Sequence, residues 1–310
     1  MRGDYPLLSQ FNELVAFVRD GERTVMLDAT NPLRPSTLLP ARHVNGEVWV
    51  VRAPAGEWVP VRGGAARHLV SARATLSPDF EVRGRADYSS TGHRALRDRE
   101  GLRDTADEPA FVRGTIFESP SDVVLDSVVV HERTVPTSPL RAEAVFSRPG
   151  MVQEIGGMLY LYPMLFRQET ENPFVSPTRR LPVDLGHPRD VSYSLHLTIP
   201  EGLELAERPV ARRLSLPSGG SYVQSVSLSG RTLLFSTRFQ LTSTLYPATL
   251  YGPLREMWDA VVAAQAEPVV LRRPAAAAAA PPAPAPAPGS GNGFRLGWWD
   301  GERLFGRPLP

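Results

Sequence analysis

Two carboxylates near the start of the sequence, Glu13 and Asp28, have a type and spacing that could do chemistry. Between them, the dipeptide Asp20-Gly21 is flanked by apolar runs, which is a strong signal for a β-hairpin with a two-residue turn. Such a turn fixes the register, so we expect Val15 to face Met26 and Glu13 to face Asp28. Adjacent carboxylates can act as an acid/base pair or bind a divalent cation, and they can equally be solvated or paired with an arginine.

Cysteine is absent from the 310 residues. Its absence excludes disulfides, thiolate metal sites and a cysteine nucleophile within this chain. The six histidines include no pair with metal-ligand spacing and carboxylate support, so we expect surface or packing histidines, no metal site and no cofactor. They are His43, His68, His93, His131, His187 and His196.

The composition is that of a globular protein, with 42% hydrophobic and 22% charged residues. A formal net charge of +1 gives no electrostatic reason to expect nucleic-acid binding. No window of about 18 apolar residues is present, so we expect no membrane span. Residues 1–18 also lack the apolar core of a signal peptide.

Alternating apolar and polar residues dominate the sequence, and 31 prolines and 25 glycines favour short strands and turns over long helices. Helices are expected at 91–105 and at 247–266. Strands are expected at 47–51, 58–61, 66–90 (as a pair), 123–135, 140–147, 158–166, 192–200 and 269–273, with three more between 212 and 241. The chain is therefore predicted to be mainly β.

The phrase FNELVAFVRDGERTVMLDATNP at 11–32, followed by LLP and an Asn-Gly, resembles the end of a bacterial transglutaminase-like domain. That family uses a cysteine on a helix, a histidine on one strand and an aspartate on the next. The resemblance places Asp28 at the family's aspartate and Glu13 at its histidine. A glutamate there adds a like charge and cannot serve as the base, so we expect Glu13 and Asp28 to be a degenerate remnant with no catalytic residue.

The resemblance continues along the chain to about residue 273. The stretches MLYLYPMLF, ENPF, SPTRRLPVDLGHP and LYPATLYGPLREMWDAV are similar, in the same order, to all-β domains of unknown function that follow such cores. The resemblance implies that this chain is the C-terminal part of a transglutaminase-like protein.

These observations predict a mainly β fold of antiparallel β-sandwich units with one or two helices, preceded by a partial α/β transglutaminase-like remnant. The expected parts are the remnant at 1–50, an antiparallel β-sandwich with one helix at 51–185, a smaller β unit with a C-terminal helix at 186–273, an Ala/Pro-rich linker at 274–293 and an aromatic tail at 294–310. The linker, PAAAAAAPPAPAPAPGSG and its surroundings, has the composition of an extended spacer.

The leading functional hypothesis is a non-catalytic structural or binding module of a bacterial transglutaminase-like envelope protein. Its partner would be a separate transglutaminase-like core or another envelope protein, and the resemblance implies a periplasmic or extracytoplasmic location. One alternative is half of a transglutaminase- or peptidase-like enzyme that is completed in trans or truncated. Another is a β-sandwich that binds carbohydrate or peptide through aromatic residues, namely Trp49, Trp58, Trp298 and Trp299.

Overall fold

The structure is a computed structural model that describes residues 7–274, apart from residues 8, 10, 12, 22, 45, 62, 106, 118, 119 and 166–168. The chain divides into two compact units, Met1–Arg273 and Pro274–Pro310. The predicted linker at 274–293, beyond Pro274, and the predicted tail at 294–310 lie outside the described residues.

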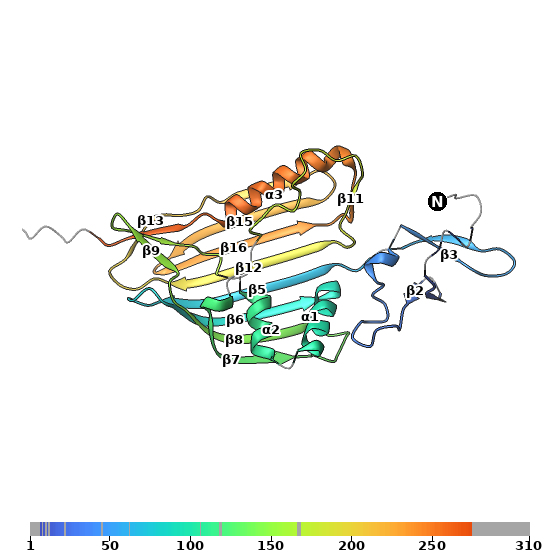
Figure 1. Cartoon of the computed structure of the whole chain (residues 1–310), viewed down its shortest axis with the longest axis horizontal. Coiled ribbons are helices and arrows are strands. Elements are labelled where there is room, and N and C mark those ends of the chain that lie inside the picture. Colours follow the sequence, from blue (N-terminus) through green and yellow to red (C-terminus); the bar gives the residue numbers. More distant parts are fainter. Residues whose placement is uncertain are drawn as a thin grey trace, which may run out of the picture. The chain divides into compact units, whose positions relative to one another are not determined.

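One eight-stranded sheet forms the centre of the first unit (Figure 1). Its strands, in spatial order, are β14 (Arg212–Leu216), β15 (Gly220–Ser229), β16 (Thr232–Leu241), β12 (Arg189–Thr198), β5 (Ala66–Leu76), β6 (Val82–Thr91), β8 (Leu140–Arg148) and β7 (Val124–His131). Neighbouring strands are antiparallel except for β5 and β12, which pair in parallel. Strands from the predicted units 51–185 and 186–273 thus belong to one sheet and meet at this parallel pair.

Alternation along the strands decides which face of this sheet is buried. In β5, Val70, Ala72 and Ala74 are buried, whereas Arg73 and Thr75 between and beyond them are exposed. Because successive side chains of a strand point to opposite faces, the apolar set forms one continuous surface that must be covered.

Two helices and a small sheet cover part of that apolar surface. The helices are α1 (Gly92–Asp104) and α2 (Glu108–Ile116), and the small sheet has the order β13 (Glu204–Glu207), β18 (Val269–Arg272), β10 (Met158–Leu161) and β9 (Val152–Ile155). Leu102 of α1, Ile116 of α2, and Leu159 and Leu271 of the small sheet share one core with the large sheet. Their burial is the main stabilising contribution to this half of the fold.

A second core lies under the C-terminal helix, α3 (Tyr251–Gln265). Leu254 and Trp258 of α3 pack in it with Tyr222 of β15 and Phe239 of β16. The two-stranded sheet of β11 (Val183–Asp184) and β17 (Leu245–Tyr246) also contributes buried residues. None of the helices in the described ranges has the length and hydropathy of a membrane span.

Two short hairpins precede the large sheet. They are β1 (Ala16–Asp20) with β2 (Arg23–Leu27), and β3 (Glu47–Val50) with β4 (Glu57–Pro60). An ion pair of 2.8 Å between Arg19 and Glu57 joins the two hairpins. Asn31, after β2, donates a hydrogen bond of 2.7 Å from Nδ2 to Oε1 of Glu100 on α1. One-turn 3-10 segments occur at Ala41–His43, Pro120–Asp122 and Ala248–Leu250.

The predicted mainly β class is confirmed, and both predicted helices are present as α1 and α3. Helix α2 and the strands β9, β11, β13 and β17 are not among the predicted elements. All five are short, so their apolar periodicity covers too few residues to stand out. A capping signal for α2 was available, because the Asp107 side chain accepts a hydrogen bond of 2.9 Å from the amide of Ala110.

Candidate functional site

The first hairpin is present, but its predicted register is wrong. Met26 pairs with Phe17 and not with Val15, and Asp20 is the last residue of β1 and not part of the turn. Gly21 has a φ of +57°, in the left-handed region that glycine adopts without strain, and it begins the turn one residue later than predicted.

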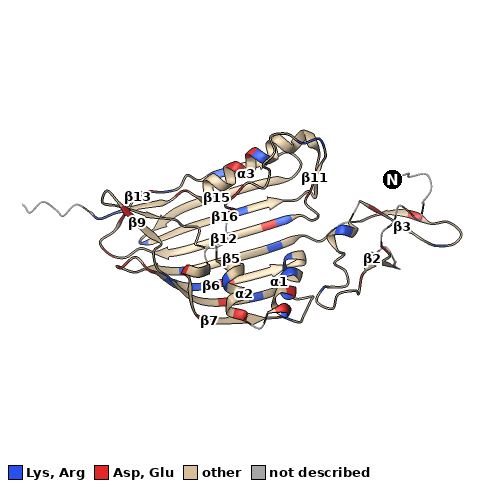
Figure 2. Cartoon of the chain, in the orientation of Figure 1, with Lys and Arg blue, Asp and Glu red and all other residues tan. Residues whose placement is uncertain are grey.

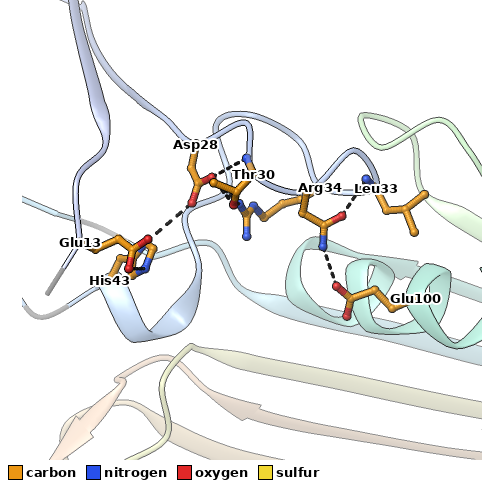
Figure 3. Close-up of polar contacts among 8 residues, drawn as sticks. Glu13, Asp28, Thr30, Leu33, Arg34, His43 and Glu100 are labelled. Carbon is orange, nitrogen blue, oxygen red and sulfur yellow. Dashed lines mark hydrogen bonds and ion pairs between the residues drawn. The ribbon is translucent and has the colours of Figure 1, made fainter.

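Glu13 and Asp28 lie beyond the paired strands, which end at Ala16 and Leu27, so they are not cross-strand neighbours. The structure places a histidine between them instead (Figure 3). The Nε2 atom of His43 lies 3.4 Å from Oε2 of Glu13, and its Nδ1 atom lies 3.8 Å from Oδ2 of Asp28. These three residues, from three separate segments, are called the His43 cluster below.

The Asp28 carboxylate is buried and held by several groups. Thr30 donates two hydrogen bonds to its Oδ1 atom, from the amide at 2.8 Å and from the hydroxyl at 2.7 Å. The Nη2 atom of Arg34 lies 2.6 Å from the same oxygen. Burial acts to raise the pKa of Asp28, but the hydrogen bonds from Thr30 and the charge of Arg34 outweigh it and lower the pKa. Asp28 is therefore ionised at neutral pH.

The His43 imidazole is buried as well, with its side chain only 4% exposed. It belongs to the 3-10 segment Ala41–His43, which starts after Pro40. Neither ring nitrogen makes a hydrogen bond to any described residue, although each faces a carboxylate. The Glu13 side chain, which faces the outer nitrogen, Nε2, is 38% exposed, whereas the Asp28 side chain is 4% exposed.

An imidazole between two carboxylates can accept, hold and pass on a proton, and Asp28 can orient the ring. The cluster has no thiol nucleophile, because the chain has no cysteine. Within the described ranges, no group of three or more histidine, aspartate or glutamate side chains is arranged to hold a metal ion. The His43 cluster is therefore a buried acid–base group without a thiol.

Sequence reasoning named Glu13 and Asp28 and missed His43. The three residues do come together, but through the histidine and not through strand pairing. The spacing of His43 from Asp28 fits no helix or strand repeat, so no periodic signal could have found it. The family resemblance expects a histidine beside Asp28, but it aligned Glu13 with that position and so did not point to His43.

A groove with a volume of about 960 Å³ lies on the covered face of the large sheet. Residues of α1 and α2 line it on one side and Trp258 of α3 on the other, with β5, β12 and β16 between them (Figure 1). It is called the α1–α3 groove below. Its lining includes Ala66, Arg97, Phe111, Arg189, Leu241 and Trp258. Its size is that of a pocket for a small-molecule ligand, which is roughly 300–1,000 Å³.

A buried aspartate fixes α1 beside this groove. Asp98 accepts hydrogen bonds from the Tyr88 hydroxyl at 2.5 Å, the Ser90 hydroxyl at 2.7 Å and Nε of Arg94 at 2.9 Å. Burial, and then the charge of Asp98, raise the pKa of Tyr88, so the phenol stays a neutral donor. The network joins α1 to β6 and holds Arg94 in a set position on the groove wall.

Two stacked histidines, one of which lines the α1–α3 groove, lie beside this network. The rings of His93 on α1 and His187 have centroids 4.8 Å apart and an angle of 14° between their planes. Burial lowers the pKa of His93 to about 4, with further contributions from His187, Arg34 and Arg97. His93 is therefore neutral at physiological pH.

Two of the four tryptophans expected to form a binding surface lie in the described part of the chain. Trp49 and Trp58 contact each other edge to face across β3 and β4, with centroids 5.2 Å apart, and Trp58 stacks on Phe11. A Cβ atom added at Gly56 would lie 2.5 Å from the Trp49 ring, so this ring packs directly against the Gly56 backbone. These rings serve the packing of the hairpin. Trp298 and Trp299 lie outside the described residues.

The fold and the two sites define a mainly β chain with a ligand-sized groove and a buried acid–base cluster. The sequence pattern of a domain of unknown function with a solved structure, DUF3858, matches residues 157–271, which span β10 to β18 and include α3. No curated protein matches the chain.

Three solved structures show a distant similarity. A protein from Parabacteroides distasonis ATCC 8503, provisionally assigned as a protease, is 14% identical over 31% of this chain, with a TM-score of 0.29. An M1 zinc metallopeptidase from Deinococcus radiodurans is 6% identical over 67%, with a TM-score of 0.25. A two-domain M1 zinc metallopeptidase mutant, E323A, bound to L-arginine is 7% identical over 69%, also with a TM-score of 0.25. This chain spans 19%, 42% and 44% of their lengths, respectively.

Proposed function

We propose that this chain is a non-catalytic binding module whose ligand occupies the α1–α3 groove. The groove is the observation that carries the proposal, because its volume of about 960 Å³ is large enough for a small molecule. Its lining combines apolar side chains such as Leu241 with charged ones such as Arg97. By the transglutaminase-like resemblance, the module would belong to a bacterial envelope protein and act outside the cytoplasm, beside a separate catalytic core or another envelope protein.

The test uses a neutral fluorescent probe, N-phenyl-1-naphthylamine, with the full chain. Gly114 of α2 lines the groove, and a Cβ atom there would meet nothing within 4 Å. Gly114→Trp should therefore fill the groove without a backbone clash, and Gly114→Ala is the matched control. We expect the wild type and Gly114→Ala to enhance the probe's fluorescence saturably, and Gly114→Trp to lose the enhancement. Equal enhancement by all three chains, or none by the wild type, would refute a ligand site in the groove.

The non-catalytic part of the proposal has its own test. The purified chain should neither hydrolyse nor transamidate glutamine-containing peptides. Such an activity, lost on Asp28→Ala with the fold intact by circular dichroism, would overturn it.

A second candidate function is an enzyme half that is completed in trans. The contact between His43 and Asp28 favours it, because a carboxylate beside an imidazole is the arrangement that activates a thiol. A cysteine-bearing partner would have to displace Glu13 from the outer nitrogen of His43. Adding a transglutaminase-like core to this chain should then give an activity that His43→Gln abolishes and Glu13→Ala raises. An activity that is indifferent to His43→Gln would exclude the idea.

A further inference from the structure

The charges in the α1–α3 groove are distributed unevenly, although acids and arginines are equal in number. The lining holds Arg94, Arg97, Arg189, Asp98, Glu169 and Glu171. Arg94 pairs with Asp98 at 2.9 Å, and Arg189 pairs with Glu169. Arg97 makes no ion pair or hydrogen bond with any residue in the described part of the chain. Figure 2 shows charged residues on α1 and on β12, the two elements that carry these arginines.

The surroundings of Arg97 are electrostatically unfavourable for a cation. Burial and the charge of Arg94 lower the pKa of Arg97, with a further contribution from Arg189, and Asp98 and Tyr88 only partly oppose them. Arg94 and Arg189 already have carboxylate partners, so an anion beside Arg97 would compensate chiefly for the Arg97 guanidinium. Glu171, the remaining acid of the lining, and Arg97 are both exposed, so solvent and salt weaken the electrostatic interactions of each.

The neighbouring histidines do not supply such an anion. His187 also lines the groove, and its ring stacks on His93. Neither imidazole can carry the negative charge, so an anionic ligand in the groove would be a counter-charge for Arg97 that these histidines cannot provide. Apolar side chains lie along the same groove and offer a surface for the rest of that ligand. They are Phe111, Leu185, Val191 and Leu241.

We infer that the groove takes a small organic anion, whose carboxylate or phosphate head binds Arg97 near Arg94 and Arg189 and whose apolar body lies against Phe111 and Leu241. This inference rests on the proposed function, since it names the chemistry of the ligand of the same groove. A guanidinium group suits this role because its planar array of donors matches two oxygens of an oxyanion.

The experiment compares two probes with the same ring system. 8-Anilino-1-naphthalenesulfonate carries a sulfonate, and N-phenyl-1-naphthylamine is its uncharged counterpart. We expect the sulfonate to bind the full chain at least about tenfold more tightly, because a charge-assisted hydrogen bond contributes that much. Arg97→Gln should remove this preference and leave the affinity for the neutral probe within about twofold. The preference should also decrease as salt is raised.

The matched control is Arg103→Gln, on the same helix. Arg103 is exposed, its one ion pair among the described residues is with its neighbour Asp104, and it does not line the groove. This change should leave both affinities unaltered. Equal affinity of the wild type for the two probes, or an equal effect of the two arginine changes, would refute the anion site. If neither probe binds, the groove is not a ligand site and the proposed function itself fails.

Competition then identifies the head group. Octanoate, octyl phosphate and octanol share one chain length and differ only in the head. We expect octanoate or octyl phosphate to displace the sulfonate probe from the wild type, and the better competitor identifies the ligand as a carboxylate or a phosphate. Displacement by octanol as strong as by the anions would contradict a charged head group.

Discussion

The Nδ1 atom of His43 lies 3.8 Å from Oδ2 of Asp28, and each of these side chains is only 4% exposed. A histidine from a 3-10 segment thus meets the carboxylate that follows β2. The same carboxylate is paired with Arg34, which is also buried. Asp28, Arg34 and His43 therefore form a small buried cluster of ionisable side chains, and substitutions in this cluster should lower the stability of the protein.

Asp28→Asn should destabilise the protein by about 3 kcal/mol, because it leaves the buried Arg34 without a counter-charge. Urea unfolding of the full chain measures this loss. The control is Arg19→Gln, which breaks the exposed ion pair with Glu57 and should cost less than about 1 kcal/mol. Equal losses for the two variants would mean that burial does not set the strength of the Asp28–Arg34 pair.

Stability should decrease as the pH falls from about 6.5 to about 4, because His93 is buried and its pKa is lowered to about 4. The unfolded chain then binds a proton on this histidine that the folded chain does not, so acid favours unfolding. The expected loss between pH 7 and pH 5 is about 2 kcal/mol. In contrast, the contribution of Asp28, whose pKa is lowered, is lost only below about pH 3.8.

His93→Phe separates the histidine from other acid effects. Phenylalanine keeps an aromatic ring against His187 and cannot be protonated. Urea midpoints of this variant should vary less between pH 7 and pH 5 than those of the wild type. An unchanged pH dependence would show that His93 is not the group responsible.

Two glycines on neighbouring helices should respond to alanine in opposite ways. At Gly114 of α2 a Cβ atom meets nothing within 4 Å, so Gly114→Ala should stabilise by about 0.5–1 kcal/mol through helix propensity. At Gly101 of α1 a Cβ atom would lie 2.7 Å from the Phe111 ring, so Gly101→Ala should destabilise by about 1 kcal/mol or more. Thermal unfolding of the pair measures both. Stabilisation by Gly101→Ala would contradict close packing of α1 on α2.

Arg99→Met should cost about 3 kcal/mol or more. The Arg99 guanidinium is buried and donates to the carbonyl oxygens of Val135 at 2.9 Å, Ser138 at 2.6 Å and Glu132 at 3.2 Å. Its loss leaves three carbonyl groups without their donor. The exposed Arg103→Met is the control and should change the urea midpoint little. Faster hydrogen exchange confined to residues 132–138 in Arg99→Met would locate the effect.

The sequence alone determined the local structure of most of this protein. Alternation in segments such as 66–76 and 140–148 marked strands with one buried face, and the spacing of Leu254, Trp258 and Val261 marked α3. These patterns are readable because the pleat of a strand and the turn of a helix impose a fixed period on burial. The absence of cysteine from the chain was equally certain from the sequence.

Only the tertiary structure decided how remote segments meet. It joined β5 to β12 in parallel, placed His43 between Glu13 and Asp28, and left Arg97 without an ion pair to any described residue in a groove between α1 and α3. No repeat in the sequence reports such neighbours, because they depend on packing and chain closure over long separations. The hairpin register was also decided by the structure, because the turn begins at Gly21 and not at Asp20. Moving the turn by one residue shifts the strand pairing by two, and a two-residue shift leaves the same side chains on each face, so the apolar pattern could not distinguish the two registers.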